Sequence, residues 1–217
     1  MNILLIGPQG SGKGTQARIL LEKFGFFYFE SGEFLRKVAG TNEELKKVLS
    51  EGQLIPDREM TSYLTAFFDQ KNLYDDIIFD GFPRTEPQYQ FWKKWLTDKE
   101  IKIDLAIVLE ISEAETVRRL TVRRKDPVTG AIYNLVTDPP PSSVDLSTLI
   151  QRDDDKPEAI KIRLASYRQR TEPLIKTLAS DMEVIEVDGE RPIEVISVDI
   201  VKIVESRIQI LKQVQEK

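Results

Sequence analysis

The glycine-rich segment Gly7-Pro8-Gln9-Gly10-Ser11-Gly12-Lys13-Gly14-Thr15 constrains the fold more than any other feature of the sequence. It directly follows the apolar run Ile3 to Ile6, which is typical of a buried strand, and it precedes a helical pattern. In that pattern apolar residues recur at helical spacing until Gly25 ends it, at Ala17, Leu20, Leu21 and Phe24. A strand, a glycine-rich loop and a helix in this order favour phosphate binding, because the loop N–H groups converge and the helix N-terminus adds positive charge.

The side chains of this loop suit the same chemistry. Lys13 can neutralise the outer phosphates of a nucleotide, while Ser11 and Thr15 offer hydroxyl groups. The match to a strict P-loop is incomplete because Gly14 separates Lys13 from Thr15. A glycine-rich turn without function is the alternative, and the strand and helix on either side disfavour it.

Alternation of strands and helices predicts the fold class. The apolar runs that indicate buried strands are Ile3 to Ile6, Phe26 to Phe29, Ile77 to Phe79, Leu105 to Ile111 and Val184 to Val187. Helical patterns lie between them; one opens with a capping box at Ser112 and Glu115, and another places Pro192 at its first position. We therefore expect an α/β fold with a five-stranded parallel sheet flanked by helices.

Composition excludes several function classes. The chain has 217 residues and 31 − 36 = −5 net charges, which argues against a general nucleic-acid binder. It has no histidine and no cysteine, so a Ser-His-Asp triad and a Cys/His zinc site are impossible, and a metal would need oxygen ligands, as magnesium does. No run approaches the roughly 18 apolar residues of a membrane span, and no signal segment is visible. These features predict a cytoplasmic protein without a membrane partner.

An acid ends the third apolar run, at Asp80. Ligands bind at the carboxyl edge of a parallel sheet, so Asp80 is expected to hold Mg²⁺, through water, beside the phosphates. The alternative is that Asp80 only begins a turn.

Residues 127–151 depart from this rhythm, because only Asp138 and Asp145 are charged there. The segment contains Pro139-Pro140-Pro141 and the β-like run Ala131 to Val136. We expect a small insertion with its own structure rather than a disordered loop.

Segment 7–15 together with Asp80-Gly81-Phe82-Pro83-Arg84-Thr85 resembles the nucleoside monophosphate kinases, and among them the adenylate kinase family. The resemblance covers essentially the whole chain. It implies a CORE P-loop domain in 1–29, 61–121 and 156–217, a monophosphate (AMP)-binding domain in 30–60, and a β-rich LID domain in 122–155. It also implies a monomer that binds ATP, AMP and ADP.

Arginines around the 122–155 insertion make physical sense beside phosphates, because planar guanidinium groups fit phosphate oxygens. Arg119 and Arg123 are spaced i, i+4, which predicts one shared helix face at the entrance of the insertion. Arg152 lies at its exit, and Arg163 follows on a helix that begins near Pro157. For each arginine alone a solvated helix face is the alternative; together they predict a LID that closes over phosphates.

The resemblance also implies residue roles. The catalytic residues would be Lys13, Arg84, Arg123, Arg152 and Arg163. The ATP site would use Gly10, Ser11, Gly12, Lys13, Gly14, Thr15, Arg119, Arg123, Ile132, Tyr133 and Arg191. The AMP site would use Ser31, Arg36, Gln53, Leu54, Ile55, Gly81, Phe82, Pro83, Arg84, Gln88, Arg152 and Arg163. Gln88 is the most informative, since an amide can pair twofold with an adenine edge. Asp154 and Asp155 resemble LID acids near the ribose and hinge, and a helix-start role is the alternative.

The chain departs from the family pattern in three places. The loop carries Pro8-Gln9 where the family has its proline one residue later, and Ser31 replaces a threonine. Many relatives hold zinc in the LID through two Cys-x-x-Cys pairs, whereas the matching positions here are Asp126, Thr129, Ser142 and Asp145. These residues are a poor zinc site, so we expect no structural zinc and predict instead that they form a hydrogen-bonded network; ordinary turn residues are the alternative.

The function that these features imply is reversible, Mg²⁺-dependent transfer of the γ-phosphoryl group of ATP to AMP, giving two ADP. Two alternatives stay open at this point. One is another monophosphate kinase, with UMP or CMP as acceptor or GTP as donor, and the other is a P-loop nucleotide-sensing module.

Overall fold

The computed structural model of the chain describes residues 1–40 and 42–215. Thr41, inside the predicted 30–60 segment, and residues 216–217, inside the predicted 156–217 segment, lie outside the described residues. None of the described helices combines the length and the apolar character needed to cross a bilayer.

A five-stranded parallel sheet forms the centre of the molecule, in the order β2-β3-β1-β4-β7. Its strands are β1 (Ile3–Ile6), β2 (Phe27–Glu30), β3 (Ile77–Asp80), β4 (Leu105–Glu110) and β7 (Val184–Asp188). The predicted fold class is confirmed, and strand ends differ from the predicted runs by a single residue where they differ at all. The strand that precedes the glycine-rich loop therefore lies in the middle of the sheet, next to the strand that ends at Asp80.

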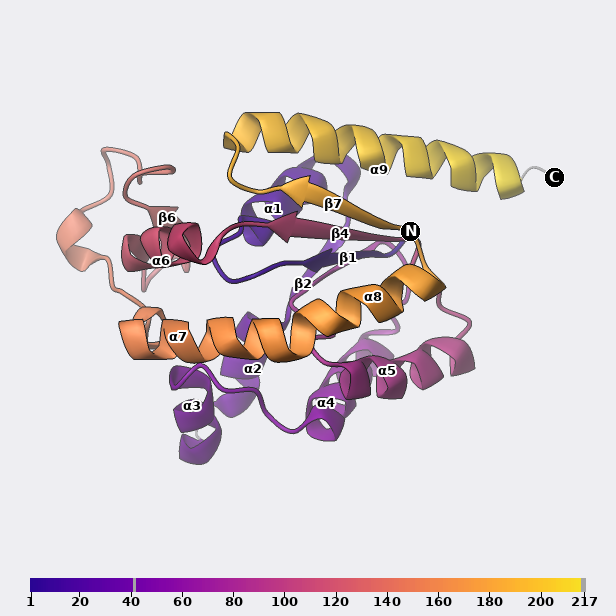
Figure 1. Cartoon of the computed structure of the whole chain (residues 1–217), viewed down its shortest axis with the longest axis horizontal. Coiled ribbons are helices and arrows are strands. Elements are labelled where there is room, and N and C mark those ends of the chain that lie inside the picture. Colours follow the sequence, from indigo (N-terminus) through magenta and orange to yellow (C-terminus); the bar gives the residue numbers. More distant parts are fainter. Residues whose placement is uncertain (41, 216–217) are drawn as a thin grey trace.

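Helices cover both faces of this sheet (Figure 1). The helices that the structure describes are α1 (Lys13–Phe24), α2 (Ser31–Ala39), α3 (Glu43–Ser50), α4 (Asp57–Lys71), α5 (Glu86–Asp98), α6 (Glu113–Thr121), α7 (Pro157–Ser166), α8 (Glu172–Asp181) and α9 (Ile193–Gln215). A π-helical turn, Tyr167–Thr171, connects α7 and α8 into one continuous rod.

Strand alternation divides the core into two layers. Leu4 and Ile6 of β1 are buried on the face that α4, α5 and α8 cover. Ile3 and Leu5 are buried on the opposite face, against α1 and α9. This period of two is the one that a strand imposes on its side chains, and a parallel sheet buried on both faces needs apolar residues at every position.

The predicted capping box at the start of α6 forms only in part. The Ser112 hydroxyl accepts a hydrogen bond from the Glu115 N–H at 3.2 Å, but the Glu115 carboxylate binds Arg118 and Arg119 instead of returning to the Ser112 N–H. Glu190 accepts that N–H at 2.8 Å. The carboxylate makes charge-assisted bonds to two guanidinium groups, which are stronger than a bond to one backbone N–H. Pro192 lies one residue before the assigned start of α9 rather than at its first position.

A small antiparallel hairpin stands at one end of the sheet, formed by β5 (Arg123–Lys125) and β6 (Ile132–Asn134). Lys125 also exchanges two backbone hydrogen bonds with Ile150, at 2.8 and 2.9 Å, so the far end of the insertion returns to the hairpin. The predicted β-like run in 131–136 therefore forms a strand only over its centre. Short 3-10 turns, Leu146–Thr148 and Asp153–Asp155, lead into α7.

Candidate functional site

One cavity of about 1360 Å³ opens at the carboxyl edge of the sheet. Its volume exceeds the roughly 300–1,000 Å³ of a pocket for one small ligand. Every residue that the sequence predicted for ATP, AMP or magnesium lines this cavity, from Gly10 in the loop to Arg191 before α9. The fold thus brings the predicted residues together, although their roles remain predictions.

The loop before α1 holds its lysine inward. The Lys13 ammonium donates hydrogen bonds to the carbonyl oxygens of Gly7 at 2.8 Å and Pro8 at 2.9 Å. Burial lowers the pKa of Lys13 to about 8. A side chain on Gly7 would collide with the Leu109 carbonyl oxygen of β4, so only glycine lets the loop approach the sheet this closely. The Lys13 ammonium therefore lies near the N-terminus of α1, where an anion is stabilised.

Asp80 lies at the end of β3, directly opposite Glu30 at the end of β2. The Tyr28 hydroxyl donates a hydrogen bond of 2.7 Å to Asp80 Oδ2, and no hydrogen bond occupies Oδ1 within the part of the chain that the structure describes. Burial raises the pKa of the Asp80 carboxyl, and Lys13 opposes that shift.

This donor set fits magnesium but not a metal held by protein alone. Residues 1–40 and 42–215 contain no group of three or more acidic residues arranged to hold a metal ion. Mg²⁺ keeps several waters and binds through one or two carboxylates together with substrate phosphates. Asp80, with one oxygen free beside the phosphate loop, can therefore orient such waters.

Ser31, Gly81 and Arg84 form a hydrogen-bonded cluster on the side of the cavity opposite the phosphate loop. We call this cluster the Ser31–Arg84 wall. The Ser31 hydroxyl and Arg84 Nε both donate to the Gly81 carbonyl oxygen, at 2.7 and 2.6 Å. One Arg84 Nη donates to Ser31 Oγ at 3.2 Å. Arg36 lies nearby on α2 and pairs with Glu30 at 3.3 Å. Two guanidinium groups are thus held at the same wall, where a monophosphate can bind.

Gln88 is buried at the start of α5, behind this wall. Its Oε1 accepts the Arg84 backbone N–H at 2.8 Å, and its Nε2 donates no hydrogen bond to any residue that the structure describes. An amide oxygen has two lone pairs, so Gln88 keeps one acceptor position and both N–H donors for a ligand.

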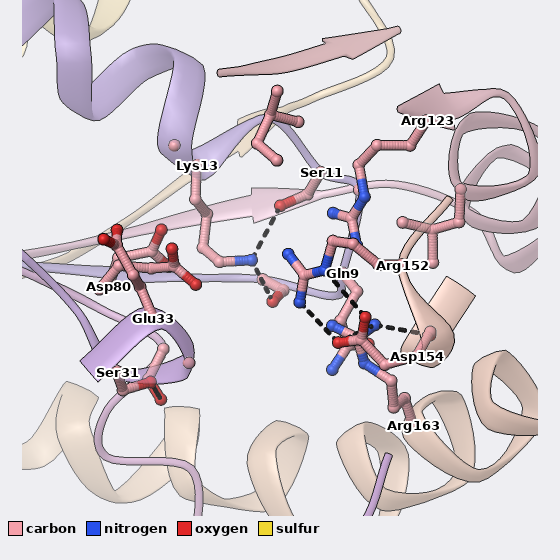
Figure 2. Close-up of a pocket in the computed structure, with 18 of the residues that line it drawn as sticks. Gln9, Ser11, Lys13, Ser31, Glu33, Asp80, Arg123, Arg152, Asp154 and Arg163 are labelled. Carbon is pink, nitrogen blue, oxygen red and sulfur yellow. Dashed lines mark hydrogen bonds and ion pairs between the residues drawn. The ribbon is translucent and has the colours of Figure 1, made fainter. Parts of the chain in front are cut away.

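The arginines at the base of the insertion pair with two acids, and Figure 2 shows Arg152 and Arg163 around one of them, Asp154. Arg123 binds both carboxylate oxygens of Asp155, at 2.5 and 2.8 Å. Arg152 binds both oxygens of Asp154, at 2.6 and 2.9 Å, and Arg163 reaches the same carboxylate at 3.1 Å. We call Arg123, Arg152 and Arg163 the hinge arginines. Three cations against two anions leave this group with net positive charge, and the nearby arginines hold the pKa of Asp154 well below its usual range against the opposing effect of burial.

The prediction that Arg119 and Arg123 share a helix face is wrong. Helix α6 ends at Thr121, and Arg123 belongs to β5. The Val122 carbonyl oxygen accepts the Leu135 N–H at 3.2 Å, so hairpin pairing replaces the next helical turn. Arg119 is instead fixed against the phosphate loop, because it donates to the carbonyl oxygens of Gly10 at 3.3 Å and of residue 189 at 2.8 Å.

The predicted network of Asp126, Thr129, Ser142 and Asp145 is also wrong as a single unit. Asp126 accepts the Thr129 hydroxyl at 2.7 Å. Asp145 accepts the hydroxyl of Ser147 at 2.7 Å, and within the described residues no hydrogen bond connects these two groups or involves the Ser142 side chain. Short polar side chains next to turns bind their own backbone first, which is the alternative that the sequence left open.

The cavity is also lined by polar residues to which the sequence analysis gave no role, among them Gln9, Tyr28 and Glu30. Glu30 carried a usable signal, since it is an acid at the end of an apolar run, as Asp80 is. Tyr28 carried no such signal, because tyrosine is a common residue in strands. Only the pairing of β2 with β3 brings Tyr28 near Asp80. Gln9 was noticed as a departure and given no role.

A phosphate-binding loop in the middle of a parallel sheet, facing arginines from an insertion, defines a P-loop phosphotransferase. A family model described as adenylate kinase matches residues 5–183. The chain is 37% identical over 202 residues to adenylate kinase of Pyrococcus furiosus, covering 89% of this chain and 91% of that protein. It is 39% identical over 197 residues to the Thermococcus onnurineus enzyme, covering 87% of each. It is 33% identical over 214 residues to the Petrotoga mobilis enzyme, covering 95% of this chain and 98% of that protein.

The chain belongs to the adenylate kinase family. Its activity is adenylate kinase activity, that of a nucleoside monophosphate phosphotransferase.

Proposed function

We propose that the cavity binds Mg²⁺-ATP and AMP at the same time and transfers the γ-phosphoryl group directly from one to the other, giving two ADP. The observation that carries the proposal is the position of Lys13 and the hinge arginines, which line the same cavity as the Ser31–Arg84 wall. ATP would lie on the loop side with Arg119, Ile132, Tyr133 and Arg191, and AMP on the wall side with Arg36 and the segment 53–55. Asp80 would orient the waters of the magnesium ion.

The chain's residues supply position and charge in this proposal. In phosphoryl transfer the main task of the protein is to position the phosphates and to stabilise their negative charge. The attacking phosphate of AMP is already an anion, so no general base is needed. Lys13 would release the Gly7 and Pro8 carbonyl oxygens and bind the β- and γ-phosphates. Magnesium, when bound, would neutralise charge on the same phosphate oxygens.

The hinge arginines would exchange partners during the reaction. In the structure Asp154 and Asp155 hold them in place within the cavity. A phosphate group carries more charge than one carboxylate and accepts the same two-pronged guanidinium bonds. We therefore propose that residues 122–155 move as a LID that brings these arginines onto the phosphates, and that residues 30–60 close over AMP.

Gln88 supports AMP as the acceptor. Its unused Nε2 and the second lone pair of its Oε1 form the donor and acceptor pair that an adenine edge requires. A base that does not present a matching donor and acceptor within reach of Gln88 would leave part of this buried amide unpaired, which costs binding free energy. We also propose, on the resemblance alone, that the enzyme works as a cytoplasmic monomer.

The test is ADP formation from Mg²⁺-ATP with AMP, CMP, UMP and GMP offered separately, and with GTP replacing ATP. We expect fast turnover with ATP and AMP. Gln88→Met should lower kcat/KM for AMP by about 10- to 100-fold, the loss expected when buried polar contacts go unpaired, and leave KM for ATP unchanged. Gln90→Met, on the exposed side of α5, is the matched control and should behave as the wild type. Equal turnover with a pyrimidine would overturn the acceptor assignment.

A further inference from the structure

The side chain of Gln9 stands at the tip of the phosphate loop. Residues 8–11 form a turn closed by a hydrogen bond of 3.3 Å from the Ser11 N–H to the Pro8 carbonyl oxygen. Gly10 takes a φ of 81°, the value that the third residue of a type II turn requires. Gln9 is therefore the second residue of the turn, and the turn geometry defines its backbone conformation.

The loop tip is also braced from outside. A methyl group on Gly10 would lie 3.3 Å from Leu120 Cδ2 and 3.6 Å from Arg119 Cβ, so the tip packs against α6. A side chain carried by a braced turn has a defined direction. Gln9 thus projects into the cavity from a rigid support rather than from a mobile loop.

The amide of Gln9 has no partner in this conformation. Its Oε1 is buried from solvent and accepts no hydrogen bond from the residues that the structure describes. A buried amide oxygen without a donor is unfavourable, and such groups are rare in folded proteins. The polar group is therefore expected to gain a partner in another state of the molecule.

The neighbourhood of Gln9 limits what that partner can be. Figure 2 shows its side chain reaching from the loop toward Arg152, Asp154 and Arg163. Guanidinium groups are donors only, and phosphate oxygens are acceptors only, whereas an amide is both. The Lys13 ammonium is also a donor only, so it cannot accept an N–H from an arginine. At the loop tip the Gln9 amide can both accept from an arginine and donate to a phosphate.

We propose that Gln9 is a further residue of the transfer site: when nucleotides bind, its Oε1 accepts an N–H from a hinge arginine and its Nε2 donates to an oxygen of the transferred phosphoryl group. The proposal rests on the proposed function of this cavity. The amide fixes one guanidinium against the phosphate at the moment when Asp154 releases it. The interaction forms fully only with the phosphates and arginines in place, so it acts on the rate more than on binding of either nucleotide.

Two variants of Gln9 separate the donor from the acceptor. Gln9→Met has a similar length and no polar atom; we expect kcat to fall about 10- to 100-fold, the loss typical of one charge-assisted hydrogen bond, with KM for ATP and AMP changed less than about 3-fold. Gln9→Glu keeps an acceptor oxygen but places a negative charge toward the phosphates, so its kcat should fall further than that of Gln9→Met. Gln90→Met is the control, and calorimetric ADP binding should be unchanged in Gln9→Met.

Each outcome bears on the proposal. Wild-type kcat in Gln9→Met would overturn it. A Gln9→Glu variant as active as the wild type would overturn the contact between Nε2 and the phosphoryl group. A change confined to KM, or a parallel loss of thermal stability, would assign Gln9 to binding or to loop structure instead. Failure of the wild type itself to turn over ATP and AMP would contradict the proposed function and not this inference alone.

Discussion

Arg123 and Asp155, 32 residues apart in the sequence, form a bidentate ion pair that closes the base of the 122–155 insertion. The Asp155 side chain has no exposed surface, and that of Arg123 is 16% exposed. One partner begins β5 and the other ends the 3-10 turn before α7, so the pair joins the two ends of segment 122–155. This buried ion pair acts beside the apolar contacts of Leu120 with Ile160 and Leu164.

Replacing Asp155 tests the role of this ion pair in stability. Asp155→Asn keeps the shape of the side chain but leaves two largely covered arginines, Arg123 and Arg163, without this carboxylate. We expect the free energy of unfolding to fall by about 3 kcal/mol, the lower end of the cost of breaking a buried ion pair. Urea denaturation followed by linear extrapolation measures it. Asp153→Asn, which removes an exposed pair with Lys156, is the control and should leave the midpoint in place. Equal stability of the two variants would contradict a structural role for the buried pair.

Substitution of Gly52 by alanine tests the contact between the 30–60 segment and α7. Its φ is 75°, and a methyl group there would lie 2.7 Å from Arg163 Cγ and 3.0 Å from the Ala159 carbonyl oxygen. Gly52→Ala should therefore lose about 1 kcal/mol from backbone strain and displace Arg163 as well, which lowers kcat. Gly130→Ala has the same strain, with φ at 77°, but nothing within 4 Å of the methyl group. Denaturation curves and initial rates should separate the two variants; a Gly130→Ala enzyme as impaired as Gly52→Ala would contradict the steric explanation.

Protonation of Lys13 should couple nucleotide binding to pH. Because burial lowers its pKa to about 8, near that pH half of the free enzyme has a neutral Lys13. Phosphate groups favour the charged form, so at pH 8 ATP binding should take up about half a proton, and affinity should fall as pH rises above 8. Calorimetry in buffers of different ionisation enthalpy measures the uptake. Lys13→Arg does not titrate in this range and should show none. Wild-type binding without proton uptake would contradict the assignment.

The lowered pKa of Lys13 also makes the stability of the fold depend on pH. The folded pKa of Lys13 lies below its ordinary value of 10.5, so between about pH 8 and 10.5 the unfolded chain binds more protons than the folded chain. The contribution of Lys13 to the free energy of unfolding therefore rises with pH across that window.

The parts of the structure that sequence analysis predicted correctly are governed by local patterns. The run Ile3 to Ile6, the loop that follows it and the Gly25 helix end depend on residues adjacent in the chain. The errors arose where another partner, near or far in the sequence, competes with the interaction that the local pattern predicts. Glu115 gave up its capping role to Arg118 and Arg119, and Arg123 left the predicted helix because the β5–β6 hairpin pairs there.

The pairing of the hinge arginines with Asp154 and Asp155 could not be predicted from spacing for the same reason. Nothing in the sequence says which acid meets Arg123, 32 residues away, because the path of residues 126–151 between them sets the contact. Gln9 was given no role for a different reason, because a polar residue in a glycine-rich loop follows no periodic pattern. What singles it out is the buried Oε1 atom without a hydrogen-bond partner, which is seen only in the three-dimensional structure.

The central claim is that phosphoryl transfer requires both nucleotides in one cavity. The direct measurement is ADP and inorganic phosphate formation from Mg²⁺-ATP, with and without AMP, in the wild type and in Lys13→Ala. The account predicts two ADP for each AMP consumed, almost no phosphate release without AMP, and loss of most turnover in a folded Lys13→Ala enzyme. Slow release of phosphate at a rate independent of AMP would contradict it and would indicate a nucleotide-sensing module instead.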